Sequence, residues 1–362
     1  MTRPIVVQHS FGDPNSGGPI TALGRILDSS LASKYEFVRM HQPSTAKPVD
    51  VRLLRQWVSF LRRVQPDLVH VRGLGNEGFR AALAARLAGC PRILVSIHGT
   101  VRDLNVPTSP RRTALVRLVE PATLRMATQV VTVCESAARR DFLRPYRTKF
   151  AGVVPNGVTL RPPSGTDRSR IRSELGLSPS DTVGIVVGRL SVEKGHLVLA
   201  DALRRIQDRG SPDITLLLAG DGPDRAAISA AYASVPGLDV RFLGRRSDVA
   251  ALLDASDLFL FPTLHENLSN ALLEGMAAGL PVVASAVGGN VEVLERGGGL
   301  LVPPSDPEGL AHAIGELLGD PALRARRGQE ARQVVEANYT VEHMIAALDG
   351  VYETILEREG PR

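Results

Sequence analysis

Short apolar runs alternate with longer amphipathic stretches along almost the whole of this chain, and that alternation limits the folds open to it. Apolar runs of about four to eight residues are typical of buried strands, whereas amphipathic stretches of about ten residues or more are typical of helices. Strands that alternate with helices predict βαβ units, in which helices cover a parallel sheet. We therefore expect an α/β protein.

The alternating series occurs twice, which predicts two domains. The first series has strand-like runs at Ile5–His9, Glu36–Met40, Leu68–Val71, Ile93–Ile97, Val130–Val133 and Gly152–Val154, with helical stretches near 19–33, 51–64, 77–88, 110–126 and 135–143. A polar, proline-rich piece at 160–166 then indicates a linker, and the second series runs from Val183 to Val302. We place the domains at 1–159 and 160–339, followed by a helix at about 340–358 that Thr340 caps.

Bulk properties fit a soluble enzyme of two domains. The chain has 362 residues, of which 43% are hydrophobic, so each domain can bury a core. No apolar run approaches the roughly 20 residues that span a bilayer, and no signal peptide precedes the first strand. Cys90 and Cys134 lack a pairing or metal-binding spacing. We expect them to be reduced core residues in a cytoplasmic protein.

The two halves of the chain carry opposite charge. Residues 1–160 hold 23 Lys and Arg against 10 Asp and Glu, a net charge of +13, and the remainder holds 20 against 28, a net charge of −8. A basic first half suggests an anionic partner. The arginine-flanked stretches 52–63 and 111–125 could lie on a membrane, but we favour sheet-covering helices with a solvated basic face. We expect no nucleic-acid partner, and no oligomeric state follows from the sequence.

Two carboxylates eight residues apart, Glu266 and Glu274, lie between two strand-like runs. Open α/β sheets bind ligands at the carboxyl ends of their strands. Asn267 or Ser269 can cap the helix that follows, so its first N–H groups can face an anion. The pair could bind the hydroxyls of a sugar and a ribose on either side of a diphosphate. Two ordinary glutamates on a solvated helix are the alternative.

A second motif carries positive charge. Gly188 and Arg189 follow the apolar run 183–187, and Lys194 comes five residues after Arg189, just before a helix. A glycine turn with two cations at a helix start is suited to binding phosphates. No Asp-x-Asp is placed to bridge a metal to a diphosphate, so we expect Arg189, Lys194 and helix ends to supply the positive charge.

With the strand-and-turn segments Leu216–Pro223 and Val240–Arg245, these motifs resemble the donor domain of the GT-B glycosyltransferases, in particular retaining family 4, whose marker is Glu-x7-Glu. The resemblance covers roughly residues 152–318. It implies two Rossmann-like domains facing across a cleft. The first domain would lie on the acceptor side, residues 160–339 would bind a nucleotide sugar, and the C-terminal helix (340–362) would return to the first domain. The family usually has Gly-Phe-Pro or Gly-Leu-Pro after the first glutamate, whereas this chain has Asn267-Leu268-Ser269.

The resemblance also implies roles for individual residues. Arg189 and Lys194 would neutralise the departing diphosphate, Glu266 would bind the donor sugar, and Glu274 would bind the ribose. His98, at the end of a strand, matches the family's active-site histidine, although a structural role is the alternative. The implied catalytic residues are His98, Glu266, Arg189 and Lys194, and the implied substrate-binding residues are Gly17, Gly18, Gly188, Arg245, Asn267, Leu268, Ser269, Asn270 and Glu274.

The implied reaction moves a hexose or N-acetylhexosamine, with retention, from UDP-GlcNAc or UDP-Glc to a hydroxyl of a small-molecule or glycan acceptor. The nucleotide sugar is a co-substrate, and no cofactor or metal is expected. A nucleotide-sugar epimerase of the same fold and a catalytically silent nucleotide-sugar-binding subunit are the alternatives. The first strand is not followed by Gly-x-Gly-x-x-Gly, which argues against an NAD-dependent enzyme.

Overall fold

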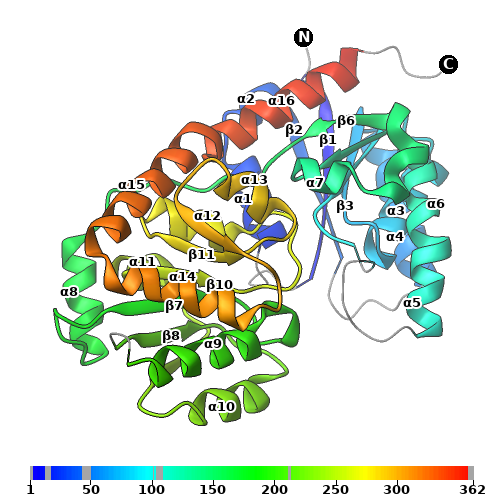
Figure 1. The fold of residues 1–362 in the computed structure, drawn as a ribbon. Coiled ribbons are helices and arrows are strands. Elements are labelled where there is room, and N and C mark those ends of the chain that lie inside the picture. The colour runs from blue at the N-terminus through cyan, green and yellow to red at the C-terminus, as the bar shows by residue number, and fades with distance from the viewer. Residues whose placement is uncertain are drawn as a thin grey trace. The chain divides into compact units, whose positions relative to one another are not determined.

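The computed structural model describes residues 3–12, 18–42, 50–100, 102, 109–210 and 213–357. The chain forms two compact units. Figure 1 shows the ribbon coloured by residue number. Unit 1 comprises Met1–Gly157 and Val341–Arg362, and unit 2 comprises Val158–Thr340. The boundaries predicted from the sequence lie at 159/160 and 339/340.

Unit 1 contains a parallel sheet of six strands in the order β2-β1-β3-β4-β5-β6. Every residue of β3 and β4 is buried because helices cover both faces of the sheet. The strands are β1 (Ile5–Phe11), β2 (Glu36–Gln42), β3 (Leu68–Arg72), β4 (Ile93–Ile97), β5 (Gln129–Thr132) and β6 (Phe150–Val153).

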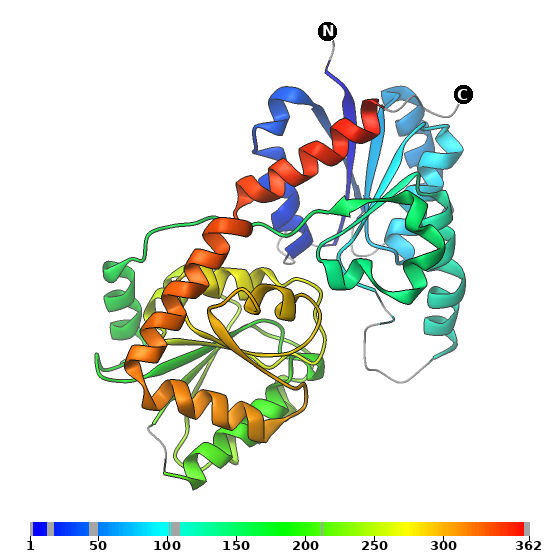
Figure 2. The same cartoon turned by 45° about the horizontal axis from the view of Figure 1, so that its top comes forward.

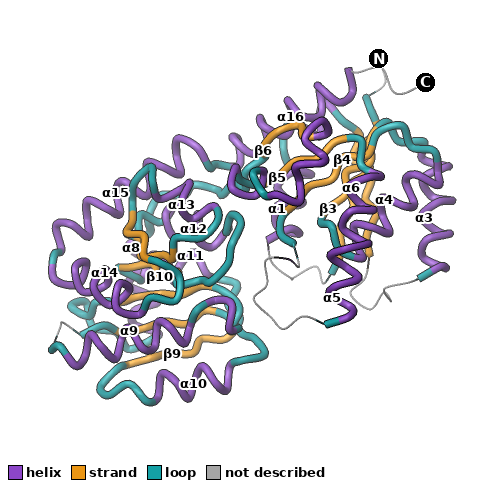
Figure 3. Tube along the Cα trace, turned by 45° about the vertical axis from the view of Figure 1, so that its right-hand side comes forward, coloured by secondary structure: helices purple, strands orange, loops and turns teal. Residues whose placement is uncertain are grey.

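Alternate residues of these strands pack into two separate cores. Val69 and Val71 face the core beneath α3 (Val51–Val64), α4 (Asn76–Ala88) and α6 (Glu120–Met126), which lie along one side of the strands in Figure 3. Leu68 faces the other core, whose helices are α1 (Gly18–Leu27), α2 (Leu31–Lys34) and α16 (Val341–Glu357). Although α16 follows unit 2 in the sequence, it packs on the sheet of unit 1, as Figure 2 shows in red. This confirms the expected return of the terminal helix.

Three helical stretches of unit 1 differ from the prediction. The stretch 19–33 is broken into α1 and α2, because the Ser29 hydroxyl donates to the Ile26 carbonyl and accepts from the Leu31 amide. The stretch 110–126 has a π-helical segment, η2 (Leu115–Val119), between α5 (Pro110–Ala114) and α6. The stretch 135–143 is wrong as one helix, because it contains only the four-residue α7 (Glu135–Ala138) and the start of a 3₁₀ segment, η3 (Asp141–Lys149).

Unit 2 contains a second parallel sheet of six strands, in the order β12-β11-β10-β7-β8-β9. Its strands are β7 (Val183–Val187), β8 (Thr215–Ala219), β9 (Asp239–Gly244), β10 (Leu258–Phe261), β11 (Val282–Ser285) and β12 (Gly299–Val302). Its helices are α8 (Gly165–Glu174), α9 (His196–Asp208), α10 (Arg225–Ala233), α11 (Val249–Ala255), α12 (Asn270–Ala277), α13 (Gly289–Leu294), α14 (Pro307–Gly319) and α15 (Pro321–Asn338), with a short 3₁₀ turn, η4 (Val192–Lys194).

Each sheet reverses its strand order beside the first strand of its unit. In unit 1, β1 lies between β2 and β3, and in unit 2, β7 lies between β8 and β10. Such a reversal leaves a crevice at the carboxyl ends of the strands, where α/β proteins bind ligands. The loops at the two crevices are therefore the places to look for function.

Candidate active site

The loop after β7 is held against its neighbours by close backbone contacts. The amide of Gly188 donates to the carbonyl of Ala219 at 3.0 Å. A Cβ atom on Gly220 would lie 1.7 Å from the carbonyl oxygen of Gly188. Glycine is therefore required for the loops after β7 and β8 to approach this closely.

The same loop is locked onto the segment that follows β10. Gly195 has a φ of +72°, and a Cβ there would lie 1.8 Å from the carbonyl oxygen of Pro262. The amide of Leu264 and the hydroxyl of Thr263 both donate to the carbonyl of Glu193, at 2.8 and 3.1 Å. These contacts bring the two loops at the crevice of unit 2 together.

This arrangement places Lys194 against Glu266. The Lys194 ammonium donates to Oε2 of Glu266 at 2.6 Å and lies 5.7 Å from the centre of the Phe261 ring. The two side chains keep only 24% and 19% of their exposure. A partly buried ion pair of this kind is screened less by salt than a surface pair. Two residues that the sequence placed in separate motifs thus meet at one point.

Arg189 lies five residues before Lys194 on the same loop, and its side chain is exposed. Its carbonyl is 3.3 Å from Nε2 of His196, and its guanidinium makes no ion pair with any described residue. The N-terminus of α9 starts at Gly195, which offers no side-chain cap. Exposed positive charge and uncapped N–H groups together favour an anion here.

Gly288 and Gly289, which the sequence analysis missed, hold the segment Glu266–Asn267 (the glutamate segment) in place through close backbone contacts. A Cβ on Gly288, whose φ is +48°, would lie 1.8 Å from the carbonyl oxygen of Glu266. The amide of Gly289 donates to the carbonyl of Asn267 at 2.6 Å. The signal was present in the sequence, because two adjacent glycines follow a strand here as one glycine does at Gly188.

The residues after Glu266 have different surroundings. Asn267 and Leu268 are 2% and 6% exposed, so both residues are buried rather than open to a ligand. Ser269 is the cap of α12, and its hydroxyl accepts from the amide of Leu272 at 3.4 Å. The Leu272 amide is therefore occupied and does not face an anion, contrary to the expectation that the first N–H groups are free. Oδ1 of Asn270 is buried without a hydrogen-bond partner among the described residues.

Two predicted residues of unit 2 lie outside these segments. Glu274 lies on α12 and is partly buried. One residue later, a Cβ on Gly275 would lie 2.6 Å from the Phe259 ring, which shows how closely α12 packs on β10. Arg245 follows β9 and is exposed.

The predicted residues of unit 1 lie on two segments of the chain. His98 directly follows β4, and burial together with the charge of Arg72 lowers its pKa to about 4. The imidazole is therefore neutral near pH 7. Gly18 is the first residue of α1, and Gly17 lies outside the described residues.

Known proteins with similar sequences identify the family. Residues 28–161 match the family model described as glycosyltransferase family 4, and residues 181–320 match the model described as glycosyl transferases group 1. This chain belongs to glycosyltransferase family 4.

Family members of assigned activity cover most of the chain. It is 31% identical to the GDP-mannose-dependent alpha-(1-6)-phosphatidylinositol dimannoside mannosyltransferase of Mycobacterium tuberculosis, over 90% of each chain. It is 30% identical to the 2-deoxystreptamine glucosyltransferase of Streptomyces kanamyceticus, over 84% of this chain and 82% of the relative. The fold matches that of sucrose-phosphate synthase from Thermosynechococcus elongatus, with a TM-score of 0.81, 22% identity, and 98% and 99% of the two chains covered.

This family 4 glycosyltransferase therefore has the GT-B fold and uses a nucleotide sugar as donor. Within the described ranges, no group of three His, Cys, Asp or Glu side chains is placed to hold a metal ion. None of the described helices is long and apolar enough to cross a membrane.

Proposed function

We propose that this glycosyltransferase moves a hexose or N-acetylhexosamine from UDP-GlcNAc or UDP-Glc, with retention of configuration, to a hydroxyl of a small-molecule or glycan acceptor. UDP is the commonest donor nucleotide in this family. The relatives' names differ in donor and acceptor, since one is a glucosyltransferase and the other is GDP-mannose-dependent.

The observation that carries the proposal is the Lys194–Glu266 ion pair, on a loop that also carries the exposed Arg189, at the crevice of unit 2. A nucleotide-sugar diphosphate gains negative charge as it leaves, and cations held in place stabilise that charge in the transition state. Lys194 is paired with Glu266. A bound donor would offer Lys194 a phosphate and Glu266 a sugar hydroxyl, so both partners of the pair would be satisfied at once.

The other predicted residues have supporting roles in this proposal. Glu274, farther along α12, would bind the ribose, and Arg245 with the backbone after β9 would meet the base. His98 would act on the sugar as a neutral imidazole, as its lowered pKa requires. No carboxylate pair need serve as nucleophile and base, because the departing phosphate can assist deprotonation of the acceptor.

A thermal-shift screen against nucleotide sugars tests the donor. A ligand at a hundred times its Kd stabilises a protein by about 2.7 kcal/mol, which is readily seen as a rise in Tm. We expect UDP-GlcNAc or UDP-Glc to raise the Tm of the wild type and not of Lys194→Ala. Stabilisation by GDP-mannose alone would make the donor assignment wrong.

The anomeric configuration of the isolated product, read by NMR coupling constants, tests retention. An α-linked product from an α-linked donor is expected. A β-linked product would contradict retention while leaving the donor assignment in place.

A further inference from the structure

Arg72, the last residue of β3, is a buried cation whose partners are neutral. It is 2% exposed. Its NH1 donates to the carbonyl of His9 and its NH2 to Oε1 of Gln8, each at 2.8 Å. No carboxylate in the described part of the chain forms an ion pair with it. Because β1 and β3 flank the strand reversal of unit 1, Arg72 spans the crevice at their carboxyl ends.

A structural role alone does not account for this residue. Burying a charge without a counter-charge costs several kcal/mol, on the order of what breaking a buried ion pair costs. Arg172 in unit 2 shows the ordinary solution, since it is 5% exposed and its guanidinium lies 3.2 Å from the carboxylate of Asp257. Hydrogen bonds to a carbonyl and an amide could be made by a neutral side chain at lower cost.

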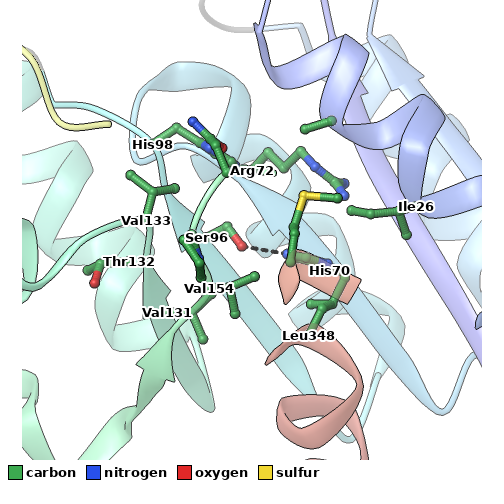
Figure 4. A pocket seen from close by; sticks show the side chains of 14 residues that line it. Ile26, His70, Arg72, Ser96, His98, Val131, Thr132, Val133, Val154 and Leu348 are labelled. Atoms are coloured by element: carbon green, nitrogen blue, oxygen red, sulfur yellow. Dashed lines mark hydrogen bonds between the residues drawn. The ribbon is translucent and has the colours of Figure 1, made fainter. Parts of the chain in front are cut away.

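A cavity lies next to Arg72. Its polar lining is formed by Arg72, Ser96, His98, Thr132 and Asn156, at or just beyond the ends of neighbouring strands, together with His70. Figure 4 shows Arg72 and His98 at this cavity, above the hydrogen bond between His70 and Ser96. The volume of about 20 Å³ admits one water-sized atom, such as a single oxygen of a larger group.

The other titratable groups at the cavity are neutral. The His70 ring is hydrogen-bonded on both sides, by the Tyr352 hydroxyl at 2.7 Å and the Ser96 hydroxyl at 2.6 Å. Burial, and then the charge of Arg72, lowers the pKa of both His70 and His98. None of the described residues that line the cavity is acidic. The rest of the lining is apolar and includes Ile26, Val131 and Leu348. The site therefore combines one positive charge and the hydroxyl groups of Ser96 and Thr132 with apolar walls and space for one oxygen.

We propose that Arg72 binds a carboxylate or phosphate of the acceptor, with one oxygen of that group in the cavity. The inference rests on the proposed function for its assignment to the acceptor. An oxoanion supplies the counter-charge that Arg72 lacks, and its one oxygen in the cavity can accept a charge-assisted hydrogen bond from the guanidinium. The acceptor class narrows to hydroxyl compounds that carry an anionic group. Arg72 is then a specificity-determining residue that touches substrate.

Anion titration tests the site without any transfer reaction. The parent protein carries Arg189→Ala and Lys194→Ala, so that the basic loop of unit 2 contributes little. Inorganic phosphate and malonate are titrated separately at an ionic strength held constant with NaCl, and Tm is followed. We expect a saturable rise in Tm, with the tighter probe showing whether the site prefers phosphate or carboxylate.

Two further variants and one matched control assign the response. Adding Arg72→Gln should abolish it, and adding Arg72→Lys should weaken the affinity about tenfold, because an ammonium lacks the planar fork. Adding Arg172→Gln, which removes an equally buried arginine of unit 2, should lower the Tm and leave the anion affinity unchanged. No saturable response to either probe, or an equal response in Arg72→Gln, overturns the proposal.

The Nε–H NMR resonance of Arg72, assigned by its absence from Arg72→Lys, settles the matter if Arg72→Gln does not fold. It should shift with the same saturation curve as the Tm, and a resonance that does not move overturns the proposal. An anion response without activity on UDP-sugars would leave this site standing and count against the proposed function alone. Activity on UDP-sugars without an anion response would support the proposed function and overturn the assignment of Arg72 as an anion site.

Discussion

Lys194 and Glu266 form an ion pair, so a donor phosphate that binds Lys194 would take the place of a carboxylate. The cost of separating the pair is offset if the diphosphate meets Lys194 and the sugar meets Glu266 in the same step. Because Arg189 has no ion pair among the described residues, it can meet the phosphate without such competition. Lys194 therefore already has a carboxylate partner, whereas Arg189 has none among the described residues.

Lys194→Ala is expected to reduce kcat by about 10²–10³-fold, because it removes charge stabilisation that grows as the diphosphate departs. Arg189→Ala should act similarly, and the two changes should be non-additive because they serve one anion. Steady-state kinetics at saturating donor measure the effect. Lys34→Ala, which removes an exposed lysine paired with Asp349 and Glu353, is the control and should leave kcat unchanged. Near wild-type turnover in folded Lys194→Ala would show that the loop does not bind the phosphates.

Gly288→Ala tests the glycine that fixes the glutamate segment. The new Cβ would lie 1.8 Å from the carbonyl oxygen of Glu266 at a φ of +48°, so the segment must shift. We expect a loss of about 1–3 kcal/mol in unfolding free energy and weaker UDP binding by calorimetry. Gly315→Ala on α14 is the matched control, since a Cβ there meets nothing within 4 Å. It should stabilise the helix by about 0.5–1 kcal/mol and leave UDP binding as it was. Unaltered UDP binding in Gly288→Ala would separate this glycine from the site.

Some of these residues could be predicted from the sequence and others could not. Lys194 and Glu266 stand in recognisable local patterns, a glycine turn after a strand and a carboxylate before a capped helix. Arg72 has no such pattern, because its burial and its lack of a carboxylate follow from β1, β3 and α16 meeting in space. A strand prediction that ended at Val71 excluded it, since arginine is rarely buried.

At the scale of elements, the strands were easier to predict than the helices of unit 1. The inner strands β3, β4, β10 and β11 are fully buried, mostly apolar runs that hydrophobicity identifies, whereas the outer strands β2, β6 and β9 also carry exposed residues. The breaks at Ser29 and in the stretch 135–149 depend on local hydrogen bonds and on Pro145, which lacks an N–H group. The spacing of apolar residues therefore does not predict where these helices break.

The helix α16 brings a polar side chain into the core of unit 1. The Tyr352 hydroxyl lies 2.8 Å from Nε2 of Gln8 and 2.7 Å from Nδ1 of His70. Tyr352→Phe would leave two buried polar groups each short of a partner, so we expect a loss of about 1–3 kcal/mol in unfolding free energy.

Urea unfolding followed by Trp57 fluorescence measures this loss in unit 1, because Trp57 is the single tryptophan and lies in that unit's core. Thr354→Ala is the control, since its hydroxyl bonds to Gly350 of the same helix at an exposed site. Its effect should stay within about 0.5 kcal/mol. A Tyr352→Phe protein as stable as the wild type would mean that this network does not hold α16 in place.

The loops at the strand ends also bear on metal dependence. Because we propose that Arg189, Lys194 and the start of α9 supply the positive charge at the crevice of unit 2, we expect activity to survive EDTA. The measurement is the initial rate after dialysis against chelator, with Mn²⁺ or Mg²⁺ added back to a second sample. An enzyme that chelation silences and either ion restores would show that a metal bridges the diphosphate.

At the scale of the whole molecule, the charge is divided unevenly, with +13 in residues 1–160 and −8 in the remainder. A field of this kind raises the local concentration of anions and weakens with salt, since the Debye length is about 10 Å at 0.1 M. The buried Arg72 gives the anion a specific destination within the same unit. Long-range steering and short-range binding therefore point to the same acceptor chemistry.

Acceptor affinity should accordingly depend on salt more than donor affinity does. With an acceptor identified by product screening, we expect its KM to rise about three- to tenfold from low to high salt, and the donor KM to change less, because the donor meets Lys194 at close range. Replacing Arg52, Arg55 and Arg63, which are exposed on α3, with glutamine should flatten this dependence without changing kcat. An acceptor KM that does not respond to salt would show that the basic surface does not attract the acceptor and reflects only the arginine-rich composition.

Sedimentation with anionic and neutral liposomes completes the test, because a soluble acceptor predicts no binding to either. Strong binding to the anionic liposomes would instead place the acceptor on a membrane surface.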